Sequence, residues 1–133
     1  MENKLQLDIV TPYGLVFSEE VDEVVATGGP GEFGVLPGHI PFITTLKIGM
    51  LTYKKGSETG HFFVNWGFAE AGPDKVLILA DSAEKSEDID IERAKEAKKR
   101  AEEKLRKAEK FDEARATSSV ERSTSRIHIA GMK

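Results

Sequence analysis

One change in composition, near Ser82, constrains the fold of this chain more than any other feature. All 5 prolines, every glycine except Gly131 and every aromatic residue except Phe111 lie before that position. After it the sequence is rich in Glu, Lys, Arg and Ala, which favour helices. Glycine and proline mark turns, whereas aromatic and β-branched residues favour strands. We therefore predict two parts, an all-β domain over residues 1–84 and a helical segment over residues 85–133.

The first part contains short apolar runs separated by turns. Leu5, Leu7 and Ile9 alternate with polar residues, which is the period of a half-buried strand. Further strand candidates are residues 21–26, 40–46, 50–53, 61–64 and 75–80. This spacing predicts a β-sandwich or a flattened barrel. A domain of about 80 residues buries only about 60% of the surface of its unfolded chain, so we expect a modest core.

The second part has the spacing of two helices. Asp88 or Asp90 can cap the first helix, and apolar residues then follow at intervals of three and four. These residues are Ala94, Ala97, Ala101 and Leu105. The pattern breaks around residues 110–112, which predicts a turn and a second helix over 112–126. Because alanine buries little area, at about 25 cal/mol per Å², we expect a weakly docked and movable hairpin.

Composition also excludes several classes of protein. The net charge is −4, which argues against a protein that mainly binds nucleic acid. The chain has no cysteine, so it can form no disulfide, thiolate metal site or cysteine nucleophile. It has no apolar run of signal-peptide length and none near the roughly 20 residues that span a bilayer. We expect a cytoplasmic protein that is associated with a membrane only through a partner.

Motifs for catalysis are weak. Residues 29–34 match the string G-x-G-x-x-G, but a dinucleotide-binding loop must open a helix. The next residues, Val-Leu-Pro-Gly, cannot begin a long helix, so we interpret the string as a glycine-rich surface turn. The three histidines lack metal-ligand spacing, and no serine lies in a nucleophile elbow. The residues therefore give no positive support for an enzyme or a metal site.

The placement of arginine is more informative. Four arginines lie on two predicted helix faces: Arg93, Arg100, Arg122 and Arg126. An antiparallel turn at residues 110 and 111 would bring Arg100 near Arg122 and Arg93 near Arg126. A polyphosphate or a cluster of carboxylates would satisfy the four charges through charge-assisted bonds. The alternative is surface pairing with three nearby glutamates, Glu92, Glu96 and Glu121.

One segment resembles the signature of a known family. Residues 31–41, G-E-F-G-V-L-P-G-H-I-P, are similar to the G-E-x-G-[IV]-x-P-G-H-x-P signature of the ε subunit of bacterial F-type ATP synthase. Residues 10–14, 67–68 and 74–80 and the charged two-helix tail also agree, so the resemblance covers the whole chain. It implies an N-terminal ten-stranded β-sandwich followed by a C-terminal antiparallel α-helical hairpin.

The resemblance also implies a function. Members are non-catalytic subunits of the central stalk, at the cytoplasmic face of the bacterial membrane. Their sandwich lies between the γ subunit and the c-ring and couples proton-driven rotation to ATP synthesis. Their hairpin can rise along γ into the α/β catalytic head and inhibit ATP hydrolysis. By the same resemblance Glu32 lies at the c-ring contact and His39 lies near the γ contact.

In some members the folded-down hairpin binds ATP through an [IL]-D-x-x-R-A motif, which residues 89–94, I-D-I-E-R-A, match. The resemblance thus implies ATP as a regulatory ligand, with no metal in the protein's part of the site. The residues it assigns to ATP are Glu84, Ile89, Asp90, Arg93, Ala94, Arg100, Arg122 and Arg126.

One segment departs from the family pattern. Residues 116–125, A-T-S-S-V-E-R-S-T-S, replace the usual Ala/Leu-rich second helix. Serine and threonine form helices less readily than alanine by several tenths of a kcal/mol each, which predicts a shorter or frayed second helix. Three rival functions stay open: a structural coupling subunit whose hairpin never switches, an enzyme acting alone, and an unrelated adaptor that uses a sheet edge.

Overall fold

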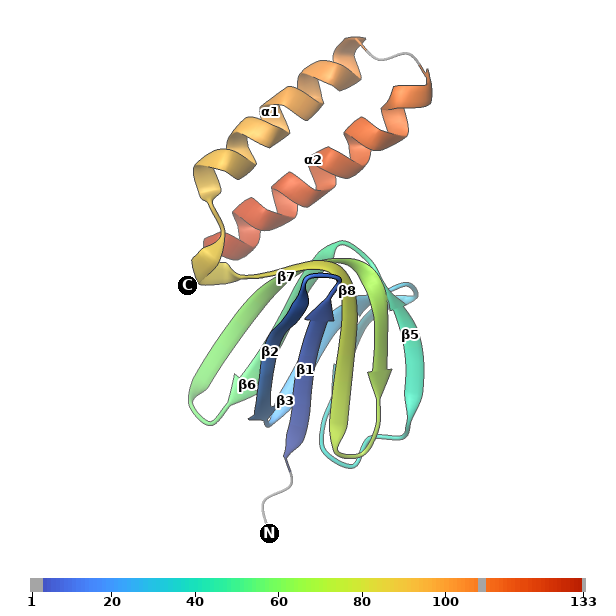
Figure 1. Cartoon of the computed structure of the whole chain (residues 1–133), viewed down its shortest axis with the longest axis vertical. Helices are drawn as coiled ribbons and strands as arrows, with labels where there is room; N and C mark the ends of the chain where they lie inside the picture. The colour runs from blue at the N-terminus through green and yellow to red at the C-terminus, as the bar shows by residue number, and fades with distance from the viewer. Residues whose placement is uncertain (1–3, 108–109, 133) are drawn as a thin grey trace.

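All strands of the chain precede all of its helices, as Figure 1 shows for the computed structural model. The structure describes residues 4–107 and 110–132, and the side chains of residues 4–106 and 115–132. The strands are β1 (Leu5–Thr11), β2 (Gly14–Val21), β3 (Glu23–Gly28), β4 (Gly31–Val35), β5 (Phe42–Leu46), β6 (Gly49–Lys55), β7 (Glu58–Ala71) and β8 (Lys75–Lys85). The helices are the 3-10 helix η1 (Ser86–Asp88) and the α-helices α1 (Ile91–Lys107) and α2 (Lys110–Ala130). The predicted fold class, a β-sandwich followed by a helical hairpin, is confirmed.

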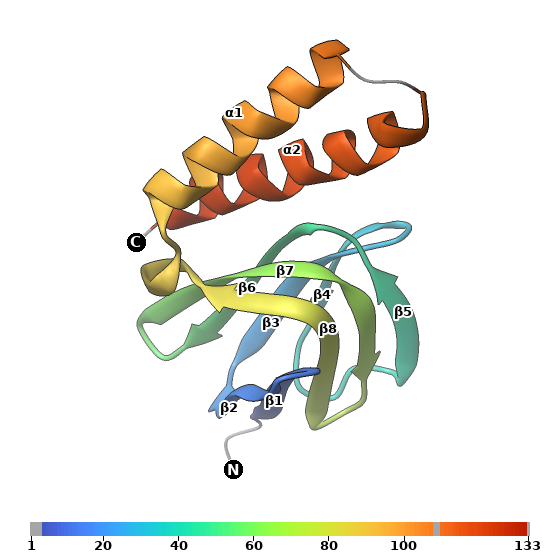
Figure 2. The ribbon, with the colours of Figure 1, turned by 45° about the horizontal axis from the view of Figure 1, so that its top comes forward.

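Two long strands, β7 and β8, belong to both layers of the sandwich. The first half of β7 pairs with β6 and its second half pairs with β5. The first half of β8 pairs with β1 and β7, and its last residues pair with β7 alone. One layer therefore has the order β2-β1-β8-β7-β5 and the other β8-β7-β6-β3-β4, with the bend visible in Figure 2. The described residues form 8 strands and not the predicted ten, because the bent strands β7 and β8 are each continuous.

The core lies between the two layers. Leu5, Leu7 and Ile9 are fully buried in it, which confirms the predicted alternation in β1. Three aromatic rings fill one part of the core, with the Phe17 ring centroid 4.9 Å from that of Tyr53 and 5.2 Å from that of Phe62. Such tilted and edge-on contacts add to the area that these rings bury.

Two strands, β2 and β4, lie where the sequence predicts none. In β2 only Phe17 and Val21 are buried, and the pairing shifts register between Ile9 and Val10 of β1, so the alternation is hidden. In β4 the glycine-rich string continues as a strand that pairs with β3. The interpretation of residues 29–34 as a surface turn is therefore wrong beyond position 30, and the dinucleotide reading is also excluded because no helix follows.

The second helix is not short. α2 has 21 residues against 17 for α1, so the prediction of a shorter or frayed helix is wrong. Ala116 and Ser123 are buried on α2, and Ala94 and Ala101 are buried on α1. Small side chains let the two helices approach closely, and tertiary packing of this kind outweighs a modest loss of intrinsic propensity. The predicted break around residues 110–112 is wrong, because α2 already begins at Lys110; residues 108 and 109 lie outside the described residues.

α2 also continues beyond Arg126, where the sequence predicts its end. Ile129 and Ala130 are buried against the sandwich, which gives the last turn a packing partner. The helix then ends at Gly131, whose N–H bonds to the carbonyl of Ile127 at 3.3 Å. None of the helices in the described ranges is both long and apolar enough to span a bilayer.

Candidate functional site at the base of the helical hairpin

The I-D-x-x-R-A motif forms the junction between sandwich and hairpin. Ile89 is buried at this junction, and Asp90 caps α1. The Asp90 Oδ1 accepts the N–H of Arg93 at 3.1 Å, and the Asp90 carbonyl accepts the N–H of Ala94 at 3.0 Å. A cap of this kind satisfies N–H groups that have no partner within the helix. Three motif residues thus have structural roles: they anchor, start and pack the first helix.

Arg126 connects the hairpin to the sandwich directly. Its Nε donates to the Oε2 of Glu84 at 3.2 Å, and its guanidinium carbon lies 4.3 Å from the ring centroid of Phe63. Phe63 and Glu84 are opposite each other in the β7–β8 pairing, so one arginine spans both. The ion pair is partly exposed, so we assign it only about 0.2–1 kcal/mol, and the cation–π contact about 0.5–1 kcal/mol.

A small apolar contact completes the docking. The hairpin base cluster consists of four buried residues, Phe63, Ile89, Ile129 and Ala130. Ile48, Met50 and Ile91 pack against it and are only partly buried. The contacts come from the last turn of α2 and the linker, because the helices extend away from the sandwich (Figure 1). The area of contact is therefore narrow, and the alanine-rich stripe of α1 takes no part in it.

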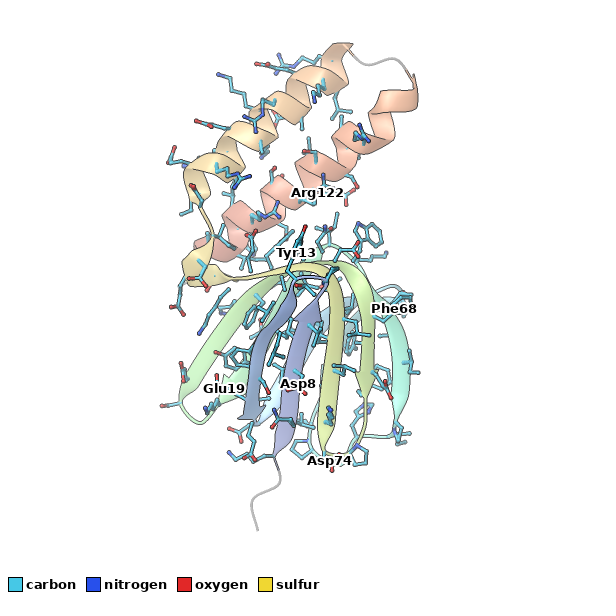
Figure 3. All side chains as sticks on the ribbon, viewed as in Figure 1. Asp8, Tyr13, Glu19, Phe68, Asp74 and Arg122 are labelled. Carbon is cyan, nitrogen blue, oxygen red and sulfur yellow. The ribbon has the colours of Figure 1, made fainter. Side chains whose placement is uncertain are left out.

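The other three arginines have no ion-pair partner among the described side chains. Arg93 and Arg100 are exposed, and Arg122 is half-buried on α2, where Figure 3 labels it. Because the helices are antiparallel, Arg100 and Arg122 stand at similar heights, about 12–14 Å from the base at 1.5 Å per residue. Arg93 and Arg126 both lie near the base. The predicted convergence of their side chains stays a prediction.

The alternative pairing of these arginines with nearby glutamates does not form within the described side chains. Glu92 lies 4.0 Å from Lys95, and no ion pair joins Glu96 or Glu121 to an arginine. The arginine that has a partner uses Glu84 instead. Three of the four guanidinium groups thus have no carboxylate partner among the described side chains.

Metal ligands are not gathered in the part of the chain that the structure describes: no three His, Asp or Glu side chains are placed to hold an ion. The Nδ1 of His61 is hydrogen-bonded to the Oγ1 of Thr52 at 2.9 Å. His39 lies in the loop after β4, with its ring centroid 5.0 Å from that of Phe42. His39 and His61 therefore lie in separate parts of the sandwich.

The two residues that the resemblance assigns to partner contacts lie at opposite ends of the sandwich. Glu32 is exposed on β4, beside the β3–β4 turn at the end that faces the hairpin (Figure 2). His39 precedes β5 at the other end, where the N–H of Gly38 bonds to the carbonyl of Pro73 at 2.6 Å. The two residues therefore lie on separate surfaces of the sandwich.

Sequence reasoning missed an exposed apolar surface on the outer side of the layer that contains β1. We call it the outer apolar face, and its large exposed residues are Leu15, Ile43, Phe68 and Leu79. Val10 pairs with both Leu15 and Leu79, and Leu79 pairs with Phe68, so these side chains form a row across four strands. Phe68 is 56% exposed, and Figure 3 shows it at the surface beside β5. The uninterrupted apolar run in β8 is the sequence signal for a strand that is apolar on both faces.

Comparison with known proteins gives consistent matches. The family model described as ATP synthase, Delta/Epsilon chain, beta-sandwich domain matches residues 4–86, and the one described as its long alpha-helix domain matches residues 87–131. The ATP synthase epsilon chain of Nitratidesulfovibrio vulgaris is 54% identical over 132 residues, 98% of either chain. That of Geobacter metallireducens is 51% identical over 133 residues, which are 98% of this chain and 96% of the relative.

A solved structure shares the fold. It is a chain of the Euglena gracilis mitochondrial ATP synthase, in a structure of OSCP/F1/c-ring, with a TM-score of 0.85 and 21% sequence identity. The match covers 100% of this chain and 84% of that chain. At this identity the likeness shows that the sandwich and the hairpin have the same arrangement.

Proposed function

Because the chain belongs to the ATP synthase epsilon chain family, we propose that it is a non-catalytic rotor subunit whose hairpin regulates ATP hydrolysis in response to ATP. In this role it couples proton translocation to ATP synthesis as part of the central stalk. As part of this complex, the subunit is peripheral and lies at the cytoplasmic face of the bacterial membrane.

The observation that carries the regulatory part is the narrow docking of an arginine-bearing hairpin. The hairpin base cluster buries four residues, and one partly exposed ion pair adds little. A ligand that binds the docked hairpin better than the undocked one therefore shifts the balance by its difference in affinity. A tenfold difference corresponds to about 1.4 kcal/mol, which is comparable with the contacts of Arg126.

ATP is the proposed ligand. Its phosphates would bind the guanidinium groups of Arg93, Arg100, Arg122 and Arg126, while Glu84, Ile89, Asp90 and Ala94 would shape the site around them. No metal is required on the protein's side of this site. Without ATP the hairpin extends, and its basic residues meet acidic groups of the α/β catalytic head.

Two further surfaces support the rotor role. The outer apolar face has the character of a protein interface, because soluble proteins rarely expose such contiguous apolar rows. We assign it to the γ subunit, together with His39 near one end of β5. Glu32, at the other end of the sandwich, is assigned to the c-ring.

Titration calorimetry of ATP into the full-length chain tests the site. We expect heat of binding for the wild type and a clear loss for Arg93→Ala, because the substitution removes one of the guanidinium groups proposed to bind phosphate. Arg93 has no ion-pair partner among the described side chains, so the substitution breaks no such pair there. Equal heats for the two proteins would remove Arg93 from the site. If ATP gave heat of binding but small-angle scattering showed no change in the compactness of the hairpin, the chain would bind ATP without switching.

The rival functions predict different results. A purely structural coupling subunit predicts that truncation after Ala83 leaves the ATPase activity of the assembled enzyme unchanged. If the chain were an unrelated adaptor that uses a sheet edge, it would not bind the γ subunit specifically. An enzyme acting alone predicts turnover of ATP by the purified chain.

A further inference from the structure

Trp66 has a backbone conformation that a large side chain rarely adopts. Its φ is 48°, and it is the one residue other than glycine with a positive φ in the described ranges 4–107 and 110–132. In this left-handed region the Cβ crowds the backbone, so a bulky residue there is a strained outlier. Strain of this kind persists only where the surrounding structure imposes it.

The surrounding strands impose it through a kink in β7. Asn65 pairs with Ser82 and Gly67 pairs with Ala80, so Trp66 and Asp81 are both left out of the ladder between β7 and β8, and neither strand has an extra residue. Gly67 holds the chain close to β8: a Cβ at this position would lie 1.9 Å from the carbonyl oxygen of Leu79. The kink interrupts the regular alternation of side chains along β7, so Trp66 is exposed although Val64, two residues earlier, is buried in the core.

The indole of Trp66 does not contribute to either apolar cluster of the free chain. Trp66 is 44% exposed and belongs neither to the sandwich core nor to the hairpin base cluster. Next to it the Oδ1 of Asn65 is buried without a hydrogen-bond partner among the described residues, which is a second local cost. Two unfavourable features at one bend indicate a position that is kept for something other than folding.

The position of Trp66 along β7 suggests what the indole contacts. It is exposed and lies two residues before Phe68, at the end of the outer apolar face that is nearest the bend. The side of the sandwich beyond the bend is occupied by the hairpin, through Phe63 of the same strand. The exposed indole is thus next, along β7, to the surface that the proposed function assigns to the γ subunit.

We propose that Trp66 is a binding anchor for the γ subunit, held at the surface by the kink in β7 at an energetic cost to the isolated chain. Large aromatic residues, and tryptophan in particular, are enriched among the few residues that dominate protein interfaces. The inference rests on the proposed function, since it takes the outer apolar face as the γ contact.

Three substitutions test the proposal in the full chain. Glycine and asparagine both tolerate a left-handed backbone, so Trp66→Gly and Trp66→Asn remove the indole without adding strain. We expect their urea midpoints to equal or exceed that of the wild type, while their affinity for purified γ falls at least about tenfold. Trp66→Phe keeps an aromatic ring and should bind within a few-fold of the wild type.

The pair of variants also controls for flexibility. If loss of binding came from a looser backbone, Trp66→Gly would lose much more affinity than Trp66→Asn, and the proposal would be overturned. A drop in the urea midpoint of Trp66→Asn would overturn it as well, because the indole would then be a packing residue. Unchanged affinity of both variants for γ would also overturn the proposal.

A spectroscopic measurement reports on the indole itself. Trp66 is the only tryptophan of the chain, so incorporation of 5-fluorotryptophan gives a single fluorine resonance. Addition of unlabelled γ should shift this resonance, and no shift in a formed complex would refute the anchor role. Absence of any complex with the wild-type chain would instead reject the proposed function. Dimerisation of the isolated chain that Trp66→Asn abolishes would assign the indole to a second copy and overturn the γ assignment.

Discussion

Ile129→Ala should release the hairpin from the sandwich while leaving both parts folded. Ile129 is fully buried in the hairpin base cluster, and the substitution removes three carbon atoms. At about 0.8 kcal/mol per buried methylene this is roughly 2.4 kcal/mol, within the range of about 2–5 kcal/mol measured for such changes. Since about 1.4 kcal/mol is a factor of ten, the ratio of docked to undocked hairpin should fall about 50-fold.

Amide hydrogen exchange measures this release, because protection reflects the free energy of local opening. We expect faster exchange at the sandwich side of the last turn of α2 and in η1, with unchanged protection in β1 and the first half of β8. Ile127→Ala is the matched control, since Ile127 is half-buried two residues away and lies outside the cluster. Its effect on docking should be much smaller. In the assembled enzyme without ATP, Ile129→Ala should strengthen inhibition of ATP hydrolysis.

Equal loss of protection throughout the chain would refute this reasoning, because it would show that sandwich and hairpin unfold as one unit. No loss in α2 would refute it too, since the docking would then depend on contacts other than the hairpin base cluster. An Ile127→Ala effect as large as that of Ile129→Ala would show that the change acts through α1–α2 packing.

Three further predictions concern the framework of the site. Asp90→Ala removes the cap of α1 and should cost about 0.5–2 kcal/mol, seen as faster exchange in its first turn with the core unchanged; full retention of protection would contradict the cap. Gly67→Ala places a Cβ against the Leu79 carbonyl oxygen and should lower the free energy of unfolding by about 1–3 kcal/mol, seen as a lower urea midpoint; an unchanged midpoint would contradict the close approach of the two strands. The hydrogen bond from Lys4 lowers the pKa of Asp22, with help from a backbone N–H. Its stabilisation is therefore present above the ordinary pKa of 3.8 and is lost as the pH falls through and below it. The stability advantage of the wild type over Asp22→Asn should shrink between pH 6 and pH 3 in urea titrations, and a constant difference would contradict the pair.

Local periodicity predicted much of the sandwich. The alternation of Leu5, Leu7 and Ile9 follows directly from the two-residue repeat of a strand, and the structure buries all three. The same rule failed for β2, since a register shift interrupts its pairing with β1 and only Phe17 and Val21 face the core. It also failed for β4, where glycines give no side-chain pattern to follow.

The candidate site was predicted in part. The resemblance singled out Glu84 and Arg126, and the structure joins them by a hydrogen bond between residues 42 positions apart. The contact of Arg126 with the ring of Phe63 was not predicted, because it depends on the pairing of β7 with β8. The role of Trp66 was also hidden, since a left-handed tryptophan follows from the kink of β7 between the two layers and not from local preference.

By itself, the sequence determined the division into a strand-rich and a helical part, the capped start of α1 and the small residues between the helices. These features depend on residues that are neighbours along the chain, so composition and spacing reveal them. The tertiary structure decided the length of α2, the sharing of β7 and β8 between two layers, and the partner of Arg126. Each of these depends on the free energy of contacts between distant segments, which outweighs local propensity and leaves no periodic trace in the sequence.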